Sequence, residues 1–226
     1  MTVDGTRLPL VPLTDVVHFP RTELRLHVLD PSFAQLFHHL AELEEDSRWL
    51  GVVLLKPGPR LDPDGRLAIF PGGTAARVLD LETHPDGHSD LVLYGETRFE
   101  LQREIPNVPY REALVRLVEE PWFNERDAGV MAVRKAIVGL LRSLCEELGE
   151  KLPLDVDDLA SGDCPYEELV NRVACRVDLP AVRKLQLLTE SLLERGLSVL
   201  SILRSRQQVL NMLRPYRRLA DGSERN

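Results

Sequence analysis

The sequence predicts an α+β protein with a mostly antiparallel β-sheet or β-barrel domain that contains one helix, followed by an α-helical bundle. Two observations lead to this fold class. Apolar and polar residues alternate over most of residues 8–119, which is typical of strands that bury one face. After Pro121 the apolar residues follow the spacing of amphipathic helices instead. We therefore expect two domains, residues 1–121 and residues 122–226.

Six or seven short strands are expected in the first domain. The clearest alternating or apolar segments are residues 23–28, 50–55, 97–101 and 113–117. Proline, aspartate and glycine gather in the intervening segments 57–59, 62–65 and 85–87, as they do in tight turns. Short strands separated by such turns favour an antiparallel sheet.

One helix is expected to interrupt the strands near residue 30. Asp30 is a suitable N-cap, and Pro31 is favoured in a first helical turn. Apolar residues then recur at helical spacing from Phe33 to Leu43, where the acidic stretch 44–46 begins. The first domain is thus an α+β unit.

Two helices open the second domain. The first is predicted over about residues 125–148, with Gly149 placed to end it. Asp163 and Pro165 are start signals for the second. The aspartates between them, at 155–158, lack the spacing of a calcium-binding loop and are expected in a solvated loop.

Two further helices complete the predicted bundle. Pro180 begins a short one. Thr189 is the expected N-cap of a long final helix, whose apolar face continues as far as Leu210 or Leu213. The polar residues 219–226 are expected to fray.

The charge balance disfavours nucleic acid as a partner, and the lack of a long apolar run disfavours a membrane. The chain has 36 acidic and 28 basic residues and a net charge of −8, which repels a polyanion. No run approaches the roughly 20 apolar residues that a membrane-spanning helix requires. Arginines near the C-terminus are the local exception, and we interpret them as stabilising a helix end, with an anionic partner as the alternative. They are Arg204, Arg206, Arg214, Arg217 and Arg218.

The cysteines and the N-terminus are typical of a cytoplasmic protein. Cys145, Cys164 and Cys175 are odd in number and lack a CxxC spacing, so neither a disulfide framework nor a zinc knuckle is expected. The first residues contain no apolar segment long enough for a signal peptide.

No catalytic, cofactor-binding or metal-binding motif is found. The sequence lacks a P-loop, a nucleophile elbow, GxGxxG and His-Glu-x-x-His. His84 and His88 are four residues apart, but residues 85–87 form a turn rather than a helix, so an exposed hairpin without metal is the expected interpretation.

Four stretches, in order, resemble the N-terminal domain of Lon-type ATP-dependent proteases. They are LPLVPLTDVVHFP at residues 8–20, LRLHVLDPSFAQLF at 24–37, GTAARV at 73–78 and the expected hairpin LVLYGETRFEL at 91–101. The predicted helices are similar to the region that follows this domain, so the resemblance covers nearly the whole chain. It implies a PUA-like sheet domain with a helical bundle behind it.

The resemblance implies a non-enzymatic polypeptide-binding or adaptor module. The sequence contains neither the Walker A motif nor the serine–lysine catalytic domain of the full protease, so no peptidase activity is expected. The implied partner is unfolded or extended polypeptide, and a separate protease is a second candidate. A homo-oligomer is left open. RNA binding is the alternative function, because PUA-like folds include RNA readers, although aromatic residues make up only 5% of the chain.

Three places are candidates for polypeptide binding: the turn after the opening strand, the segment that matches GxxRF, and the aromatic pair at the domain junction. The residues concerned are Phe19, Pro20, Arg98, Phe99, Trp122 and Phe123. Packing within the protein explains each of them equally well. No cofactor is expected.

Overall fold

The computed structural model describes residues 5–62, 65–106, 109–148, 155–161 and 163–223, with side chains as far as residue 213. The chain divides into two compact units. The sheet unit comprises Met1–Pro121 and Val177–Thr189, and the helical unit comprises Trp122–Arg176 and Glu190–Asn226.

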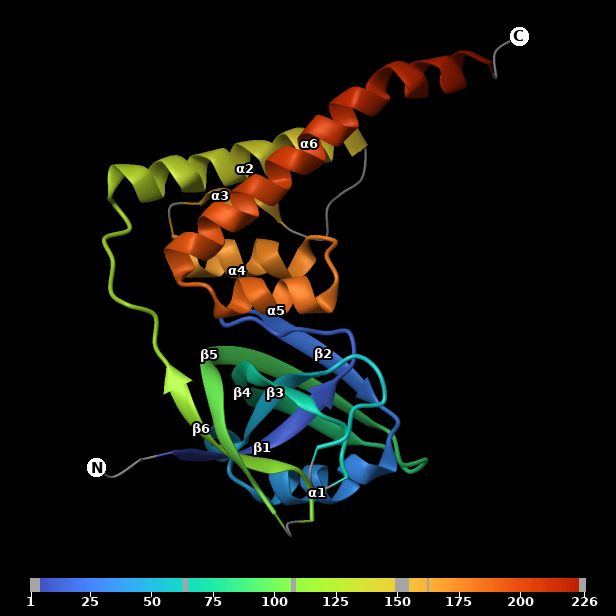
Figure 1. Cartoon of the computed structure of the whole chain (residues 1–226), viewed down its shortest axis with the longest axis vertical. Coiled ribbons are helices and arrows are strands. Elements are labelled where there is room, and N and C mark those ends of the chain that lie inside the picture. The colour runs from blue at the N-terminus through green and yellow to red at the C-terminus, as the bar shows by residue number, and fades with distance from the viewer. Residues whose placement is uncertain (1–4, 63–64, 107–108, 149–154, 162, 224–226) are drawn as a thin grey trace. The chain divides into compact units, whose positions relative to one another are not determined.

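The sheet unit is built on six strands (Figure 1), which are β1 (Thr6–Leu13), β2 (Glu23–Val28), β3 (Trp49–Leu55), β4 (Ile69–Thr83), β5 (Ser89–Ile105) and β6 (Glu112–Val118). Their order is β2-β5-β4-β3-β1-β6, and β6 also pairs with β5. Five strands therefore close into a barrel, and β2 extends from β5. Only β1 and β3 are parallel among these pairs. The predicted α+β fold with a mostly antiparallel sheet is confirmed.

Strands β4 and β5 are much longer than the short strands that the sequence predicts. Residues 91–101, expected as a hairpin, instead belong to one continuous strand. Ala75 pairs with Thr97 and Ala76 with Gly95, so the ladder skips Glu96. This irregularity hides the length of the strand, because it breaks the period of two in the sequence.

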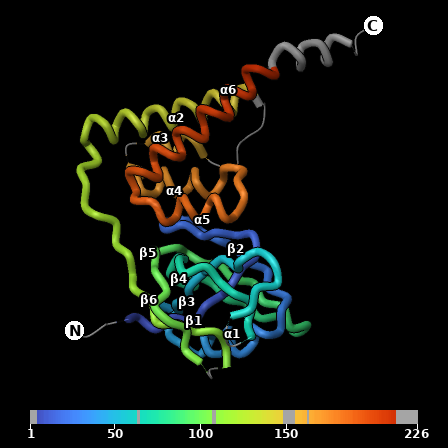
Figure 2. The backbone as a smooth tube through the Cα atoms, in the orientation of Figure 1, coloured from blue at the N-terminus to red at the C-terminus, as the bar shows by residue number. Residues whose placement is uncertain are grey.

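Helix α1 (Ala34–Glu42) covers one end of the sheet (Figures 1 and 2). It is preceded by a 3₁₀ turn at Pro31–Phe33, and the side chain of Asp30 accepts a hydrogen bond from Ser32 N at 2.9 Å, which confirms the predicted cap. The buried face of α1 packs into a core cluster with residues of β1, β3, β4 and β5. The helix contributes Leu36, Phe37 and Leu40.

Helix α5 (Ala181–Thr189) belongs to the sheet unit, whereas the expected boundary placed it with the other helices. Its apolar side chains Leu185 and Leu188 are buried. Arg98 Nη1 donates to Leu188 O at 2.9 Å, and Arg98 Nη2 lies 3.0 Å from Glu120 Oε1. The reason for the difference is that an amphipathic helix packs wherever its apolar face finds a complementary surface, which helical periodicity does not specify.

The helical unit contains α2 (Ala128–Leu148), α3 (Val156–Ala160), α4 (Tyr166–Arg176) and α6 (Leu192–Ser223), and α6 lies along α2 (Figure 2). Helix α3 corrects the expected loop. Its N-cap is Asp155, whose carboxylate accepts hydrogen bonds from Asp157 N and Asp158 N. The expected helix stop, Gly149, lies outside the described residues. None of the described helices is both long and apolar enough to cross a bilayer.

The long final helix begins after Ser191, not after Thr189. Thr189 ends α5, and its hydroxyl donates to Gln186 O at 2.8 Å. Ser191 and Glu194 form a capping box, in which the Glu194 carboxylate accepts from Ser191 N at 3.1 Å and Ser191 Oγ accepts from Glu194 N at 3.4 Å. Hydrogen bonds from Ser191 lower the pKa of Glu194.

The C-terminal part of α6 is helical to Ser223, so residues 219–223 correct the expected fraying. Residues 224–226 lie outside the described part of the chain. Arg204 and Arg206 are exposed on this helix. The side chains of the other members of the arginine group are beyond those described: Arg214, Arg217 and Arg218.

A fully buried arginine organises the helical unit. Arg195 on α6 is 0% exposed, and its Nη1 donates to Asn171 Oδ1 on α4 at 2.6 Å. Its Nη2 donates to Glu190 O at 2.9 Å. Buried charge is stable only where hydrogen bonds compensate for lost hydration, so these contacts fix α6 against α4.

Candidate functional site at the free edge of β2

Strand β2 is the edge strand of the sheet unit. It pairs with β5 on one side, and no other described strand pairs with it. Its side chains alternate between exposed and half-buried positions along the whole strand. The exposed residues are Glu23, Arg25 and His27, and the half-buried residues are Leu24, Leu26 and Val28.

A bulge sets the register of β2 against β5. Arg21 N donates to Gly95 O at 2.8 Å, and Gly95 N donates to Thr22 O at 3.0 Å, so two residues of the incoming segment oppose one residue of β5. Arg21 has a φ of 59°, the left-handed conformation of the first residue in a G1 bulge. The bulge therefore determines which backbone groups of β2 face β5.

The outward backbone groups of β2 follow from this register. Hydrogen-bonded and non-hydrogen-bonded residue pairs alternate along an antiparallel ladder. Gly95 N donates to Thr22 O, so Thr22 and Gly95 are the first hydrogen-bonded pair and the next pair, Glu23 with Tyr94, is not hydrogen-bonded. The backbone groups of every second residue, starting from Glu23 and including Arg25 and His27, consequently point to the free edge. Such N–H and C=O groups are a template for an added strand.

The turn that precedes β2 is held tightly. Thr22 Oγ1 donates to Phe19 O at 2.7 Å, and Thr74 Oγ1 on β4 donates to His18 O at 2.6 Å. The absence of a side chain at Gly95 lets the backbone of Phe19 approach, since a Cβ there would lie 2.3 Å from Phe19 O. The start of β2 is thus fixed by the barrel itself.

Four of the residues predicted to bind polypeptide are buried and form part of this framework. Phe19 is 0% and Phe99 2% exposed, Pro20 is also buried, and Arg98 is 8% exposed. Phe99 packs in a core cluster with β1, β3, β4 and β6. In this structure a bound chain would not reach them, so their position corrects the expected surface.

The other two predicted residues, Trp122 and Phe123, lie in the helical unit. Trp122 is 90% exposed. Phe123 is half-buried, and its ring meets that of Tyr166 edge to face at 5.8 Å between centroids. Of the six predicted residues, Trp122 is therefore the one that is broadly accessible. The outward backbone groups of β2 were not among the sites that the sequence predicts, because no sequence pattern shows which strand lies at an edge.

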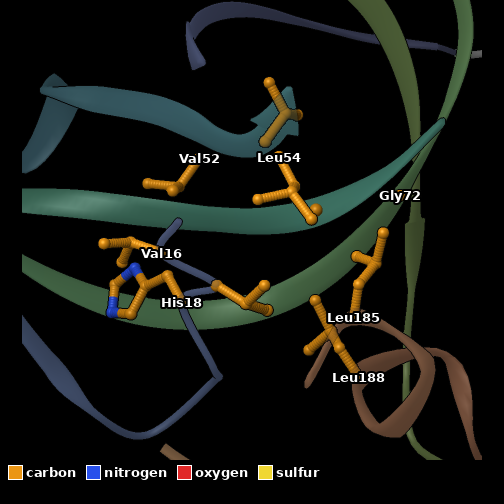
Figure 3. Close-up of a pocket in the computed structure, with 10 residues that line it drawn as sticks. Val16, His18, Val52, Leu54, Gly72, Leu185 and Leu188 are labelled. Carbon is orange, nitrogen blue, oxygen red and sulfur yellow. The ribbon is translucent and has the colours of Figure 1, made fainter. Parts of the chain in front are cut away.

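Strands β3 and β4, the segment before β2 and α5 surround an apolar hollow (Figure 3). Its labelled walls include Val16, His18 and Leu54 from the barrel side and Leu185 and Leu188 from α5. The walls lie so close together that not even a water molecule fits between them. The hollow is therefore a packing seam rather than a ligand site.

His18 is a buried imidazole in this seam. It is 2% exposed, and its Nε2 lies 2.9 Å from Thr22 O, so the Nε2–H tautomer donates to that carbonyl. Its Nδ1 has no hydrogen-bond partner among the residues that the structure describes. Burial lowers the pKa of His18 to about 4, against a smaller rise from the bond to Thr22. His18 is therefore neutral at neutral pH.

Acid is expected to destabilise the sheet unit through His18. His18 binds a proton below about pH 6.5 in the unfolded state and only below about pH 4 in the folded state. The stability that neutral His18 contributes is therefore fully present above about pH 6.5, and it is lost as the pH falls from 6.5 to 4. At pH 4.5 the loss from this group is about 2.5 kcal/mol.

Urea unfolding at pH 7 and at pH 4.5 measures this loss in the free energy of unfolding. His18→Gln, which keeps an N–H donor but does not titrate, should lose about 2.5 kcal/mol less than the wild type between the two pH values; equal losses would contradict the assignment.

Comparison with known proteins places the chain in a family. The model of the "ATP-dependent protease La (LON) substrate-binding domain" matches residues 7–205. The Lon protease of Rhizobium meliloti (strain 1021) is 28% identical over 188 residues, which cover 82% of this chain and 22% of that protein. The Lon protease of Anaeromyxobacter dehalogenans (strain 2CP-C) is 29% identical over 206 residues, covering 91% and 24%. The chain thus spans about a quarter of the length of these relatives.

Two solved structures share the fold. The Lon N-terminal domain protein from Xanthomonas campestris has a TM-score of 0.61 at 22% identity, covering 87% of this chain and 98% of that one. The N-terminal domain of the Mycobacterium avium complex Lon protease has a TM-score of 0.63 at 17% identity, covering 88% and 98%. The family match, together with the barrel, its edge strand and the helices that follow, shows that this chain belongs to the family of Lon substrate-binding domains.

Proposed function

We propose that this chain is a non-enzymatic module that binds extended polypeptide as an additional strand on the free edge of β2. The observation that carries the proposal is the row of outward backbone groups at Glu23, Arg25 and His27, held in register by the bulge at Arg21. The description of the family as the substrate-binding domain of a protease supports it, because the substrates of proteases are polypeptides.

Binding of this kind has little sequence preference. Main-chain hydrogen bonds supply the affinity, and they are the same for every residue except proline. The exposed face of β2 carries both charge signs, in Glu23 and Arg25, and Leu29 immediately after the strand is 70% exposed. These features suit unfolded segments of mixed composition, with an apolar contact at the end of the strand.

Proline at position 25 provides the test. The N–H of residue 25 points to the free edge, so Arg25→Pro removes an outward donor and leaves the ladder to β5 intact. Arg25→Ala is the matched control, because it removes the same side chain and keeps the N–H. Fluorescence anisotropy with a labelled, reduced and carboxymethylated polypeptide should show binding weakened about tenfold or more by proline and less than about twofold by alanine.

Salt and folding controls make this result decisive. Circular dichroism and thermal unfolding of Arg25→Pro should match the wild type, since proline is tolerated on edge strands. Affinity for polypeptide should change little between low and high salt. Equal binding by the proline and alanine variants would exclude the β2 edge, and steep, salt-sensitive binding of an RNA oligomer alone would replace the proposal with RNA recognition.

We also infer that Trp122 contributes an aromatic contact to polypeptide. An exposed indole offers a large apolar face with a polar N–H, a combination that is frequent at binding surfaces. Trp122→Ala should weaken binding, and Phe123→Leu should do so less, because Phe123 packs on Tyr166.

The polypeptides that the protein binds would be passed to a separate protease, so that the protein acts as an adaptor.

A further inference from the structure

Three of the six histidines gather where the β4–β5 hairpin meets β2. His27 lies on β2 directly opposite Asp90 on β5, and His84 and His88 flank the tip of the hairpin. One nitrogen of His27, one nitrogen of His88 and one oxygen of Asp90 all lie within 4.8 Å of one another. Four polar side chains from three strand ends thus converge on one point of the sheet unit.

The hairpin turn brings its two histidines face to face. His84 N donates to His88 O at 2.9 Å, and Gly87, with a φ of 91°, closes the turn through a bond from its N–H to His84 O at 3.0 Å. The rings of His84 and His88 stack at 4.1 Å between centroids, and those of His27 and His88 lie at 4.7 Å. Residues 85–87 form the expected turn, and the pairing of β2 with β5 adds His27 to the two histidines of the hairpin.

Asp90 lies at the centre of the group. His27 Nδ1 is 2.7 Å from Asp90 Oδ1, and His84 Nε2 is 2.9 Å from Asp90 Oδ2, so each carboxylate oxygen faces a different imidazole. Asp90 therefore offers a carboxylate oxygen to a cation at the point where the imidazoles of His27 and His84 meet it.

A second carboxylate lies behind His88. Nδ1 of His88 is paired with the carboxylate of Asp86. A neutral imidazole that donates through Nδ1 carries its lone pair on Nε2. Carboxylates placed behind histidines in this way orient the ring and raise its basicity in many metal sites.

We propose that His27, His88 and Asp90 form a binding site for a divalent transition-metal ion, with Zn²⁺ as the ion that fits best, and that His84 positions Asp90 through its second oxygen. Two imidazole nitrogens with one carboxylate suit Zn²⁺ rather than Ca²⁺ or Mg²⁺, which prefer oxygen ligands alone. Three protein ligands leave a fourth position for water or for a group of a bound partner.

The geometry requires only side-chain movement. Zn²⁺ bonds of about 2.0–2.2 Å bring tetrahedral ligands within roughly 3.5 Å of one another, closer than the observed limit of 4.8 Å. The side chains of His27 and Asp90 are 55% and 50% exposed, so both can rotate. A bound ion would tie the β4–β5 hairpin to the edge strand β2.

Metal titration of the untagged, EDTA-treated protein tests the site. Calorimetry with ZnCl₂ should show one saturable site per chain, and Co²⁺ should give visible absorption without a thiolate charge-transfer band. His27→Gln and Asp90→Asn should each weaken Zn²⁺ binding at least tenfold, and His84→Gln should weaken it about tenfold while the Co²⁺ spectrum keeps its form. His38→Gln is the matched control, since His38 is exposed beside Glu42 on α1, and it should leave the affinity unchanged.

The proposal would be overturned by any of three results: no saturable Zn²⁺ binding, binding that survives both His27→Gln and Asp90→Asn, or a Co²⁺ spectrum with thiolate bands, which would assign the ion to the cysteines. Thermal unfolding in EDTA separates loss of the site from loss of the fold, because the variants should melt with the wild type there. Polypeptide binding in EDTA is a separate readout, so failure of the metal site leaves the proposed function unaffected.

Discussion

Gly95→Ala is expected to lower the free energy of unfolding of the sheet unit by about 3 kcal/mol. A Cβ at this position would lie 2.3 Å from Phe19 O and 3.1 Å from Pro20 Cα. Both are backbone atoms and cannot rotate aside, so the turn must move away from β5. That movement weakens the bonds of the bulge between Gly95 and the residues Arg21 and Thr22.

Tryptophan fluorescence during urea unfolding measures this loss. Trp49 is half-buried in β3 and reports on the sheet unit, whereas the indole of Trp122 is already 90% exposed and changes little. Gly139→Ala on α2 is the control, because no neighbouring atom of the described residues lies within 4 Å of the added methyl group. It should leave the Trp49 transition of the sheet unit unchanged and stabilise the helical unit by about 0.5–1 kcal/mol, as far-UV circular dichroism would measure. A Gly95→Ala protein as stable as the wild type would show that the turn moves freely. If Gly95→Ala does destabilise the sheet unit, it should also weaken polypeptide binding, but by less than Arg25→Pro does.

Arg195→Ala is expected to cost the helical unit about 4 kcal/mol. The substitution empties the volume of a fully buried side chain and removes the donors that serve Asn171 Oδ1 and Glu190 O. Asn171 is itself 0% exposed, so water does not reach its amide without rearrangement of α4 and α6. Both the cavity and the lost hydrogen bonds therefore act in the same direction.

Far-UV circular dichroism during thermal and urea unfolding measures the effect, because α2, α4 and α6 contribute most of the helical signal. Arg204→Ala on the same helix is the matched control. Arg204 is exposed, and surface substitutions of this kind change stability by about 0.5 kcal/mol or less. If both variants unfolded together with the wild type, the contacts of Arg195 would be shown to contribute little net stability.

The sequence predicts elements better than it predicts their partners. Strand β2 and the Asp30 cap of the 3₁₀ turn that leads into α1 follow from local signals, namely alternation and an Asp–Pro pair, and both are confirmed. Helix α3 was missed because five residues are too few to display a helical period. The start of α6 was displaced because Thr189 and Ser191 are both acceptable caps, and only the bond from Ser191 N to Glu194 distinguishes them.

The candidate sites depend on pairings that no local pattern contains. Alternation at 23–28 predicts a strand but not that it lies at an edge, since that depends on which strands take the places beside it. Likewise, the hairpin at His84 and His88 was visible in the sequence, whereas His27 joins it only through the register of β2 with β5. Phe19 and Phe99 were expected at the surface from their places in a turn and in a supposed hairpin, whereas the barrel buries both.

The assignment of α5 to the sheet unit has a consequence for synthesis on the ribosome. Residues 177–189 emerge only after the first three helices of the helical unit have been made. Until then, Arg98 lacks the carbonyl of Leu188, and the apolar side of the seam that contains His18 is exposed to water. The packing of the sheet unit is therefore completed only after residues 177–189 have been synthesised. A fragment that ends at Pro121 would leave this apolar surface exposed and would be prone to aggregate.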